Sequence, residues 1–506
     1  MKTISLATNR WVHRSMLSIL LLLTSLTSAM AQQILTLEEC RKLALEQNKQ
    51  VRMADDDVAM AQLKKKEMET KYLPRISFNG GYLRTQKNFS LFEKDQFLPI
   101  VPYNTIDPKT GNFNPQALAD PATAMNTLVI NPKTGQPMLD SSGNPIFKNY
   151  AMLPADKLNL GEQNKFYAGF SLQQPIFMGL KIVEGNKMAS VAANIAQEKV
   201  LLTKAEVLVQ TDQAYWRAVS LQEKVKLAKS YEGLLDQLVT DLSNMYAEGI
   251  ITNNDVLKAQ VKQNEAKLKV LKAENGLALS KMALAQIIGM VDEEIELYDS
   301  RIDQQEFAPS ALASAELVAD NRLELSMLKE KLLIMESKEN IERSKFMPNI
   351  FLTAGYGWMN PNPYNSLKKE FGGDWHVGVV VSIPLVTWGE RSHSLHSAQI
   401  EKTKTQRELD QAREMIQLQV RQNQYKYTES IKKVELTKLS KSQAEENMRV
   451  TKEQLREGRV RLTDLLEAQV QWESAASEYI DALIEHKVTL SELEKATGEI
   501  YKYIHE

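Results

Sequence analysis

Several features that carry chemistry or crosslinks in other proteins are scarce in this chain of 506 residues. The single cysteine, Cys40, excludes an intrachain disulfide, and we interpret it as a structural residue of the first helix. There are six histidines without a His-x-x-x-His pair, no glycine-rich phosphate loop and no nucleophile-base set. We therefore expect no enzyme, no cofactor and no bound metal. His393 and His396 have a spacing that suits two metal ligands on one helix face, but we expect both to face solvent.

Long apolar runs are equally scarce. Residues 1–31 combine the basic positions Lys2, Arg10 and Arg14 with the apolar run MLSILLLLTSL and Ala-Met-Ala, which predicts a secretory signal peptide cleaved before residue 32. Cleavage changes the formal net charge from −2 to −5, because three basic and no acidic residues leave. Without a clustered basic face, this balance gives no reason to expect nucleic acid as a partner. No later run approaches the roughly 18–20 apolar residues of a membrane-spanning helix, so strands would have to make any membrane crossing.

The chain contains two diverged copies of one pattern. Three pairs of segments match: YLPRISFNGGY (72–82) with FMPNIFLTAGYGW (346–358) at an offset of 274 residues, and, both at an offset of 209, FYAGFSLQQPIFMG (166–179) with WHVGVVVSIPLVTWG (375–389) and YAEGIITNNDVLKAQ (246–260) with LREGRVRLTDLLEAQ (455–469). We predict a first repeat over 32–290, a linker over 291–315 and a second repeat over 316–506.

The two offsets differ by 65 residues, and we assign this extra length to an insertion at 83–165 in the first repeat. The insertion holds nine of the sixteen prolines and the sequences DPKTGN (107–112), NPKTGQ (131–136) and DSSGNP (140–145). Because Pro fixes φ and Gly supplies positive φ, these sequences predict short hairpins in an elaborated loop. A calcium-binding loop is the alternative interpretation of their Asp, Asn and Gly residues.

Very long helices are predicted between and after the strands. Proline is absent between Pro175 and Pro309 and after Pro384. In 462–493 ten mostly apolar positions recur at alternating steps of three and four: Leu462, Leu465, Gln469, Trp472, Ala476, Tyr479, Leu483, His486, Leu490 and Leu493. As one helix, 179–249 would be about 105 Å long at 1.5 Å per residue.

The helix lengths also suggest how the elements pair. In the first half, the short segments 249–289 and 313–347 placed end to end would match the long helix. In the second half, 389–458 is the long helix, and 459–497 with 36–71 is the short pair. We expect a rod of helices with all four strands gathered at one end.

The strand segments alternate between two kinds of side chain. In 166–173 the residues Phe166, Ala168, Phe170 and Leu172 oppose Tyr167, Gly169, Ser171 and Gln173, and 375–383 alternates in the same way. Apolar-out and small-or-polar-in is typical of outer-membrane barrel strands, although a half-buried soluble sheet alternates similarly. Four strands are too few to close a membrane barrel, and lipid does not tolerate open sheet edges. If the strands span a membrane, several chains must share one barrel.

Together these features resemble the outer-membrane efflux protein family, the TolC-like exit ducts of tripartite pumps and type I secretion systems. The resemblance covers residues 36–500 and is carried by the motifs YLPRISF, FMPNIF, QQPIFMG and SIPLVTWG, the two EG-x₅-D-(V/L)-L-x-A-Q turns and the helix-ending Gly289 and Gly498. It implies a mainly α-helical fold with a β-barrel portion. In this fold, three copies form a twelve-stranded outer-membrane barrel continuous with a periplasmic α-helical barrel. The insertion at 83–165 departs from the family's short external loops.

The resemblance also implies a function. The chain would be a passive exit duct that conducts substrate from an inner-membrane pump, of RND or ABC type, and a periplasmic adaptor to the exterior. Its partners would be two further copies of itself, the adaptor, the pump and outer-membrane lipid. It would need no cofactor, because the pump supplies the energy. The alternatives are a periplasmic coiled-coil adaptor and a structural rod without a pore, and neither accounts for the four strands.

The resemblance places both EG turns at the periplasmic tip of the duct. Gly249 and Gly458 turn the chain there, with Asp255 following the first turn. The residues that flank the adaptor-docking grooves are Tyr246, Glu248, Ile250, Leu455, Glu457, Arg459 and Val460.

In the family, acidic residues six and nine places after the second glycine line a pore constriction, and here these are Asp464 and Glu467. A three-fold axis would gather them into two carboxylate rings, which favour cations in a narrow pore. The alternative is that Asp464 is an N-cap and Asp464-x-x-Glu467 a capping box. In the first turn Asp255 matches Asp464, but Lys258 occupies the position of Glu467. Val460 stands where the family has a basic latch residue, and Arg459 or Arg461 is the candidate substitute.

Overall fold

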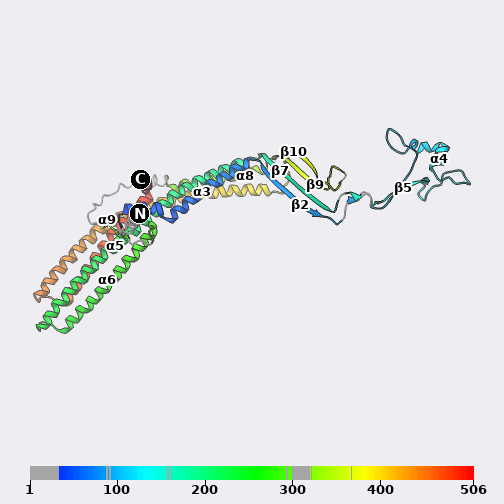
Figure 1. Ribbon diagram of the computed structural model, residues 1–506. Coiled ribbons are helices and arrows are strands. Elements are labelled where there is room, and N and C mark those ends of the chain that lie inside the picture. Colours follow the sequence, from blue (N-terminus) through cyan, green and yellow to red (C-terminus); the bar gives the residue numbers. More distant parts are fainter. Residues whose placement is uncertain are drawn as a thin grey trace, which may run out of the picture. The chain divides into compact units, whose positions relative to one another are not determined.

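The computed structural model describes residues 33–86, 89–90, 93–155, 159–160, 162–291, 295–298, 320, 322–365 and 367–505. The predicted signal peptide and most of the predicted linker lie outside these residues. The chain divides into two units (Figure 1). The helical unit comprises the described parts of Met1–Glu69, Leu180–Lys345 and Thr387–Glu506, and the strand unit comprises those of Thr70–Gly179 and Phe346–Val386.

The helical unit is built from two long and several shorter helices. Its helices are α2 (Leu37–Gln47), α3 (Lys49–Glu69), α5 (Lys181–Ala247), α6 (Asn253–Ile288), α8 (Leu323–Ser344), α9 (Glu390–Arg456), α10 (Leu462–Thr497) and α11 (Lys502–His505), and its strands β1 (Gln33–Leu35) and β8 (Ile295–Leu297) pair in parallel. α5 and α9 have 67 residues each, which corresponds to about 100 Å of helix. The prediction of two long helices, each continuing through a short turn into a shorter helix, is confirmed.

The single helix predicted over 36–71 is interrupted at Asn48. This residue has φ −63° and ψ 130°, and α2 ends before it. Its side-chain Nδ2 donates to the carbonyl of Ile287 over 2.8 Å, and its Oδ1 accepts from the backbone N–H of Gln50 over 2.8 Å. The break therefore depends on a contact with α6, more than 200 residues away in sequence, and local periodicity does not predict it.

The predicted end-to-end pairing of the short helices is wrong. The end of α6 meets the junction of α2 and α3 through the Asn48 contact. At the start of α8, Arg322 donates from Nη1 to the carbonyl of Ala496 at the end of α10 over 2.7 Å. In space, therefore, α3 lies end to end with α6, and α8 lies end to end with α10. Length could not separate the two pairings, because α3 and α8 have 21 and 22 residues.

Ion pairs show how these pairs lie along the long helices. α3 and α6 both pack along α5. Lys199 of α5 pairs with Asp57 of α3 at 3.2 Å, and Lys229 of α5 pairs with Glu274 of α6 at 2.7 Å. α8 and α10 both pack along α9. Glu408 of α9 pairs with Lys331 of α8 at 2.8 Å, and Lys433 of α9 pairs with Glu485 of α10 at 2.5 Å. α8 and α10 also contact α5, so they separate the two long helices.

A core cluster forms where α2, α5, α6 and α10 meet. Cys40 is fully buried in it, beside Leu35, Ala44 and Ile288, and burial raises the pKa of its thiol to about 12. The interpretation of Cys40 as a structural residue is confirmed.

The strand unit contains one four-stranded antiparallel sheet, in the order β10-β9-β7-β2. Its strands are β2 (Arg75–Arg84), β7 (Asn164–Met178), β9 (Asn349–Asn360) and β10 (Gly372–Ser382). All four lie in segments that the sequence predicts as strands. The last strand begins three residues before the predicted segment 375–383 and ends at Ser382, two residues before Pro384, which has no backbone N–H for a ladder.

The register gathers apolar side chains on one face of this sheet. The apolar face carries Ile76, Phe78, Tyr82, Phe166, Phe170, Leu172, Leu352, Tyr356, Trp358, Trp375, Val377, Val379 and Val381, because these residues pair across the strands. Phe78 packs on Phe170 with ring centroids 5.0 Å apart, and Phe170 on Trp358 at 6.3 Å. The polar face carries small and polar residues, including Ser77, Asn79, Gly169, Ser171, Thr353, Gly357, Asp374 and His376. The predicted alternation is confirmed.

The insertion forms the hairpins that its turn sequences predict. Its further elements are β3 (Phe89–Ser90), β4 (Gln96–Pro99), α4 (Pro121–Thr127), β5 (Tyr150–Leu153) and β6 (Asn159–Leu160). Bridges Ile106–Phe113, Ile130–Pro137 and Leu139–Pro145 close the three predicted turns. Gly111 at φ +66° and Gly135 at φ +71° occupy the same position in the two Pro-Lys-Thr-Gly turns. The carboxylate of Asp107 accepts from Lys109 N and Thr110 Oγ1, so it closes the turn from within.

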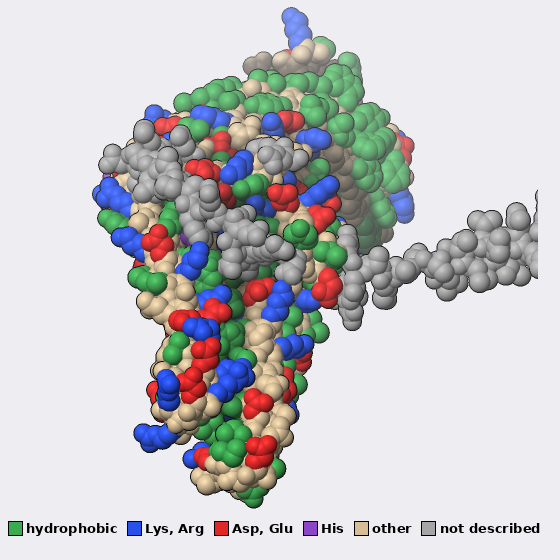
Figure 2. Space-filling view, turned by 90° about the vertical axis from the view of Figure 1, so that its left-hand side faces the viewer, with side chains coloured by type: hydrophobic (Ala, Val, Ile, Leu, Met, Phe, Trp, Pro, Cys, Tyr) green, Lys and Arg blue, Asp and Glu red, His purple; other side chains and the backbone are tan. Residues whose placement is uncertain are grey.

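Charge is mixed over the helical surface. In the view of Figure 2, basic and acidic side chains alternate over the helices and do not gather into a patch of one sign. His393 and His396 are exposed on α9. Within the described ranges, no group of three or more His, Cys, Asp or Glu residues gathers as for a metal ion. Of the helices in the described part of the chain, none has both the length and the hydropathy of a membrane span.

Candidate functional site

The first turn ends α5 and is closed by backbone hydrogen bonds. Gly249 N–H donates to Tyr246 O over 2.9 Å, and Ile250 N–H donates back to Met245 O over 2.9 Å. Gly249 has φ +76°, a left-handed conformation that favours glycine after a helix C-terminus. This bond pattern satisfies carbonyls that the helix end leaves free.

The second turn repeats this geometry 209 residues later. Gly458 N–H donates to Leu455 O over 3.0 Å, and Arg459 N–H donates to Gln454 O over 2.9 Å. Gly458 has φ +70°. In both turns a short non-helical segment separates the end of one helix from the start of the next. The sequence repeat is therefore also a repeat of backbone conformation.

Each following helix has an acidic residue at its third position, which completes the first turn. In α6, Asp255 Oδ2 accepts from Thr252 Oγ1 over 2.9 Å, which together with nearby Lys258 lowers the pKa of Asp255. In α10, Asp464 Oδ2 accepts from the backbone N–H of Arg461 over 2.9 Å. Asp255 and Asp464 are thus equivalent in position and similar in role.

The alternative interpretation, a capping box in which Asp464 is the N-cap and Glu467 its partner, is contradicted by the start of α10. α10 begins at Leu462 and its N-cap is Arg461, so Asp464 is the third helical residue and caps from inside the helix. Glu467 lies one turn farther along, where its Oε1 accepts from Gln471 Nε2 at 3.5 Å. The box was misplaced because an apolar residue, Leu462, and not an Asp or Ser, begins the helix.

Asp464 and Glu467 lie on the exposed side of α10. Three residues apart, they share a helix face, and both are exposed. The residues between and beside them, Leu465, Leu466 and Ala468, are buried. The apolar side of the helix therefore packs inward while the two carboxylates face away from this chain.

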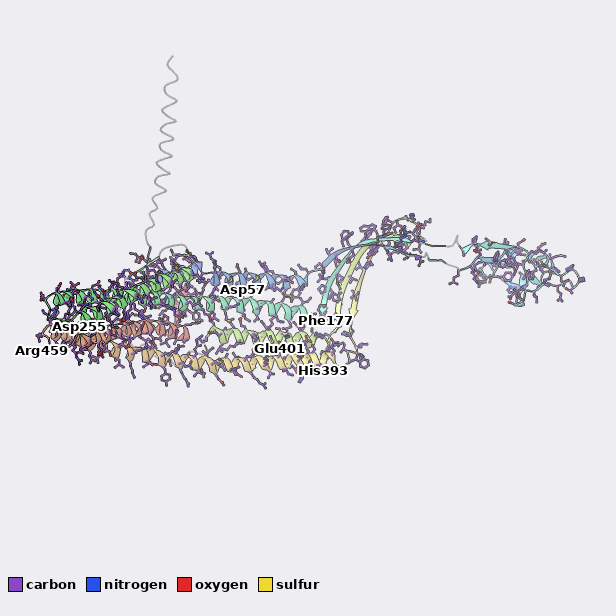
Figure 3. All side chains as sticks on the ribbon, turned by 90° about the horizontal axis from the view of Figure 1, so that it is seen from below. Asp57, Phe177, Asp255, His393, Glu401 and Arg459 are labelled. Carbon is purple, nitrogen blue, oxygen red and sulfur yellow. The ribbon has the colours of Figure 1, made fainter. Side chains whose placement is uncertain are left out.

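One core cluster joins the two hairpins near their turns. It contains Leu242 of α5, Val256 of α6 and Leu462 and Leu465 of α10, with Leu455 packed against it. Figure 3 shows Asp255 and Arg459 at the same end of the helical unit. Around the turns Tyr246, Glu248, Ile250, Glu457 and Arg459 are exposed, while Leu455 and Val460 are half-buried.

A groove lies between α5 and α9, with α10 as its floor. Asp241 lines it from α5, and Lys452 and Arg456 line it from α9. Gln469 of α10 is only 3% exposed, and its Oε1 has no hydrogen-bond partner among the described residues. An acceptor buried in this way costs free energy, of the order of 1–3 kcal/mol, unless a donor reaches it. The groove thus offers an apolar floor, an unused acceptor and opposite charges on its two walls.

Sequence patterns do not predict the walls of this groove. Gln469 stands out in the sequence only as the end of the repeated turn motif, matched by Gln260. Asp241, Lys452 and Arg456 belong to no motif. Their helical positions alone give no reason to group them, because they come together only when α5 and α9 both pack against α10. Of the two candidate latch residues, Arg459 pairs with Glu457 of its own turn at 3.0 Å.

Comparisons with known proteins agree on one family. A family model described as "Outer membrane efflux protein" matches residues 145–290 and 316–499. The alkaline protease secretion protein AprF of Pseudomonas aeruginosa is 22% identical over 67% of this chain and 70% of its own length. The outer membrane protein TolC of Vibrio cholerae is 20% identical over 67% of this chain and 78% of its own. The fold is similar to that of the CmeC outer membrane channel of Campylobacter jejuni, with a TM-score of 0.67, 16% identity and coverage of 91% of this chain and 85% of that one.

Proposed function

This chain belongs to the outer membrane efflux protein family, and on that basis we propose that it is a passive exit duct in the outer membrane. It receives cargo from an inner-membrane pump and a periplasmic adaptor and releases it outside the cell. The duct itself needs no cofactor, because the pump drives transport.

The observation that carries this proposal is the division of the sheet into two faces. Ile76, Trp375 and Val379 of the apolar face are 67%, 68% and 64% exposed, which is costly in water and favourable in lipid. The opposite face is richer in small and polar residues, such as Ser77, Gly169 and Asp374, as a water-filled lumen requires. Neither a periplasmic adaptor nor a structural rod needs such a sheet.

The two outer strands of the sheet support a shared barrel. Among the described residues β10 and β2 each have a strand partner on one side only, and lipid does not tolerate open edges. We infer that three copies close one twelve-stranded barrel, β10 of one chain pairing with β2 of the next. The helical units then form a periplasmic tunnel continuous with it. α9 exposes Ile400, Met415, Leu418 and Tyr425, which suits packing against a neighbouring copy.

We assign the two turns to the periplasmic tip and the groove between α5 and α9 to adaptor docking. The exposed Tyr246, Ile250 and Glu457 around the turns are accessible to such a partner. Asp464 and Glu467 face away from their own chain, so a three-fold axis on that side would gather them into two acidic rings.

Conductance in planar bilayers tests the proposal. The purified protein in mild detergent should run as a trimer and, after reconstitution, open discrete cation-selective conductances. A monomer without conductance would refute the duct. A trimer without conductance would support the trimeric assembly but would refute the conducting pore, so the proposed function would also fail.

A further inference from the structure

A depression lies on the polar face of the sheet and is not part of the tip site. Its volume is about 440 Å³, within the roughly 300–1,000 Å³ of small-molecule sites. The register explains its position, because Asn79, Gly169, Gly357 and Asp374 pair directly across the four strands and form one row. The two central members of the row have no side chains, so the middle of the sheet is bare backbone.

Larger side chains frame this bare row. On one side, the neighbouring row contributes Tyr167 and Met359. The row on the other side contributes Ser171 and His376, which are separated by Gly355. Tyr167 is 51% and Met359 49% exposed, so a ligand can reach both. The result is a flat floor between an apolar and aromatic wall on one side and a polar wall on the other.

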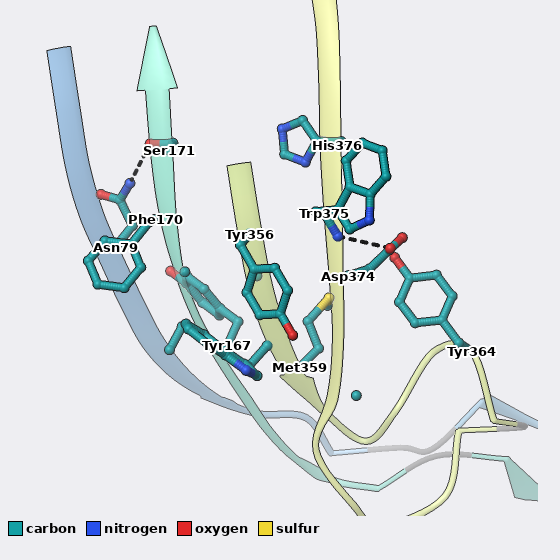
Figure 4. Close-up of a pocket in the computed structure, with 15 residues that line it drawn as sticks. Asn79, Tyr167, Phe170, Ser171, Tyr356, Met359, Tyr364, Asp374, Trp375 and His376 are labelled. Atoms are coloured by element: carbon teal, nitrogen blue, oxygen red, sulfur yellow. Dashed lines mark hydrogen bonds between the residues drawn. The ribbon is translucent and has the colours of Figure 1, made fainter. Parts of the chain in front are cut away.

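One carboxylate sits at the edge of the floor. Asp374 Oδ1 accepts from the backbone N–H of Trp375 over 2.8 Å. The Tyr364 hydroxyl, in the loop after β9, also hydrogen-bonds to this carboxylate, which raises the pKa of the phenol. Figure 4 shows Tyr364 beside Asp374 at the rim. No Lys or Arg is among the described residues that line the depression.

The geometry points to a binding site for planar organic cations. The glycine floor accepts a flat ring system, the faces of Tyr167 and Tyr364 attract positive charge, and Asp374 pairs with it. Anions would meet a carboxylate, and no Lys or Arg among the described lining residues would offset it. We propose that cargo or inhibitors of this chemical class bind here. The contribution to transport rests on the proposed function, whereas binding to the sheet does not.

The glycines of the polar face provide a matched pair of variants. A Cβ at Gly357 would have no atom nearer than 3.9 Å, from Ala168 O, and one at Gly378 none nearer than 3.9 Å, from Thr353 Oγ1. Both positions therefore accept a side chain, but only Gly357 lies in the depression. Gly169 is unsuitable, because its Cβ would lie 2.8 Å from Tyr356 O.

Fluorescence anisotropy of ethidium with the detergent-solubilised full-length protein tests the inference. G357L should fill the floor and weaken ethidium binding about tenfold or more, and D374N should weaken it several-fold. G378L should bind as the wild type does. The anion fluorescein should bind at least about tenfold more weakly than ethidium.

Equal ethidium affinity of G357L and the wild type would overturn the inference, as would equal binding of fluorescein. Conductance of the same preparations separates this result from the proposed function. A protein that conducts but binds ethidium equally in G357L and G378L refutes only the site. A protein that shows the binding pattern without conductance refutes only the duct.

Discussion

Arg41 of α2 and Asp212 of α5 form a two-point ion pair in the core of the helical unit. Nε of Arg41 lies 2.7 Å from Oδ1 of Asp212, and Nη2 lies 2.5 Å from Oδ2. Ser491 of α10 donates to the same carboxylate over 2.6 Å, and the guanidinium lies 4.1 Å from the ring centroid of Tyr503. One fully buried carboxylate thus connects α2, α5 and α10.

Removing Arg41 should therefore destabilise the helical unit strongly. R41A leaves Asp212 buried without its counter-charge, and we expect a loss of about 3–5 kcal/mol in the free energy of unfolding. K199A removes an exposed pair with Asp57 and should cost no more than about 1 kcal/mol. Urea unfolding followed by helical circular dichroism measures both. Similar losses in the two variants would show that burial of the pair does not matter.

The turn glycines should be required for their backbone conformation alone. Nothing lies within 4 Å of a Cβ built at Gly458, so G458A should cost about 1–2 kcal/mol through positive φ and not through a clash. G233A, in the middle of α5 and equally open, should instead stabilise by about 0.5–1 kcal/mol. Relative to the wild type, the midpoint of thermal unfolding should fall in G458A and rise in G233A.

The acidic pair of α10 should control block of the pore by divalent cations. D464N/E467Q should raise the half-blocking concentration about tenfold, which corresponds to about 1.4 kcal/mol of lost cation affinity. E446Q/E453Q removes two acids that pair with Arg449 on α9 and should leave block unchanged. E467Q alone should alter block without lowering stability, since Glu467 does not cap the helix. Unchanged block in the double variant would reduce Asp464 to a helix cap.

His486 should make stability fall in mild acid. Burial between α9 and α10, with Lys487 nearby, lowers the pKa of His486 to about 4. Its Nδ1 lies 3.0 Å from Ser430 Oγ. The unfolded chain has a histidine pKa near about 6.5, so the stabilising contribution of neutral His486 is complete above that pH and is lost as the pH falls toward about 4. H486Q should show a smaller drop in melting temperature between about pH 7.5 and about pH 5 than the wild type. H393Q, at an exposed position of α9, should keep the wild-type drop.

Two adjacent valines of β10 test which face meets lipid. Val379 is on the apolar face and Val380 on the polar face. V379R should reduce the yield of folded trimer in lipid vesicles, because Arg on a lipid-facing strand costs about 2–4 kcal/mol near the bilayer centre. V380R should assemble normally and change the conductance instead. Equal yields of the two variants would contradict the assignment of the faces.

The sequence predicts the strands and helices well because their signals are local. Proline-free runs between turn glycines locate α5, α6, α9 and α10, and alternation locates the four strands of the sheet. The interruption at Asn48 is not predictable in this way, because its hydrogen-bond partner, Ile287, belongs to another helix. The pairing of α6 with α3 is not predictable either, because two helices of nearly equal length are interchangeable until their ends make specific contacts.

Some features of the candidate sites are likewise predictable from the sequence, and others are not. The glycines and the acidic residues at 255 and 464 repeat in sequence, so the amino-acid sequence alone shows that the two turns are equivalent. The groove with Gln469 and the row from Asn79 to Asp374 combine residues that are distant in sequence, and no single segment carries their pattern.

Helix and strand periodicities and turn chemistry act over a few residues, so the order of amino acids is enough to specify two hairpins of long helices and a sheet with one apolar and one polar face. Which helix ends meet, where α10 begins and which side chains share a depression became clear only in the folded chain. Those outcomes depend on packing and hydrogen bonds between residues that only the folded chain brings together.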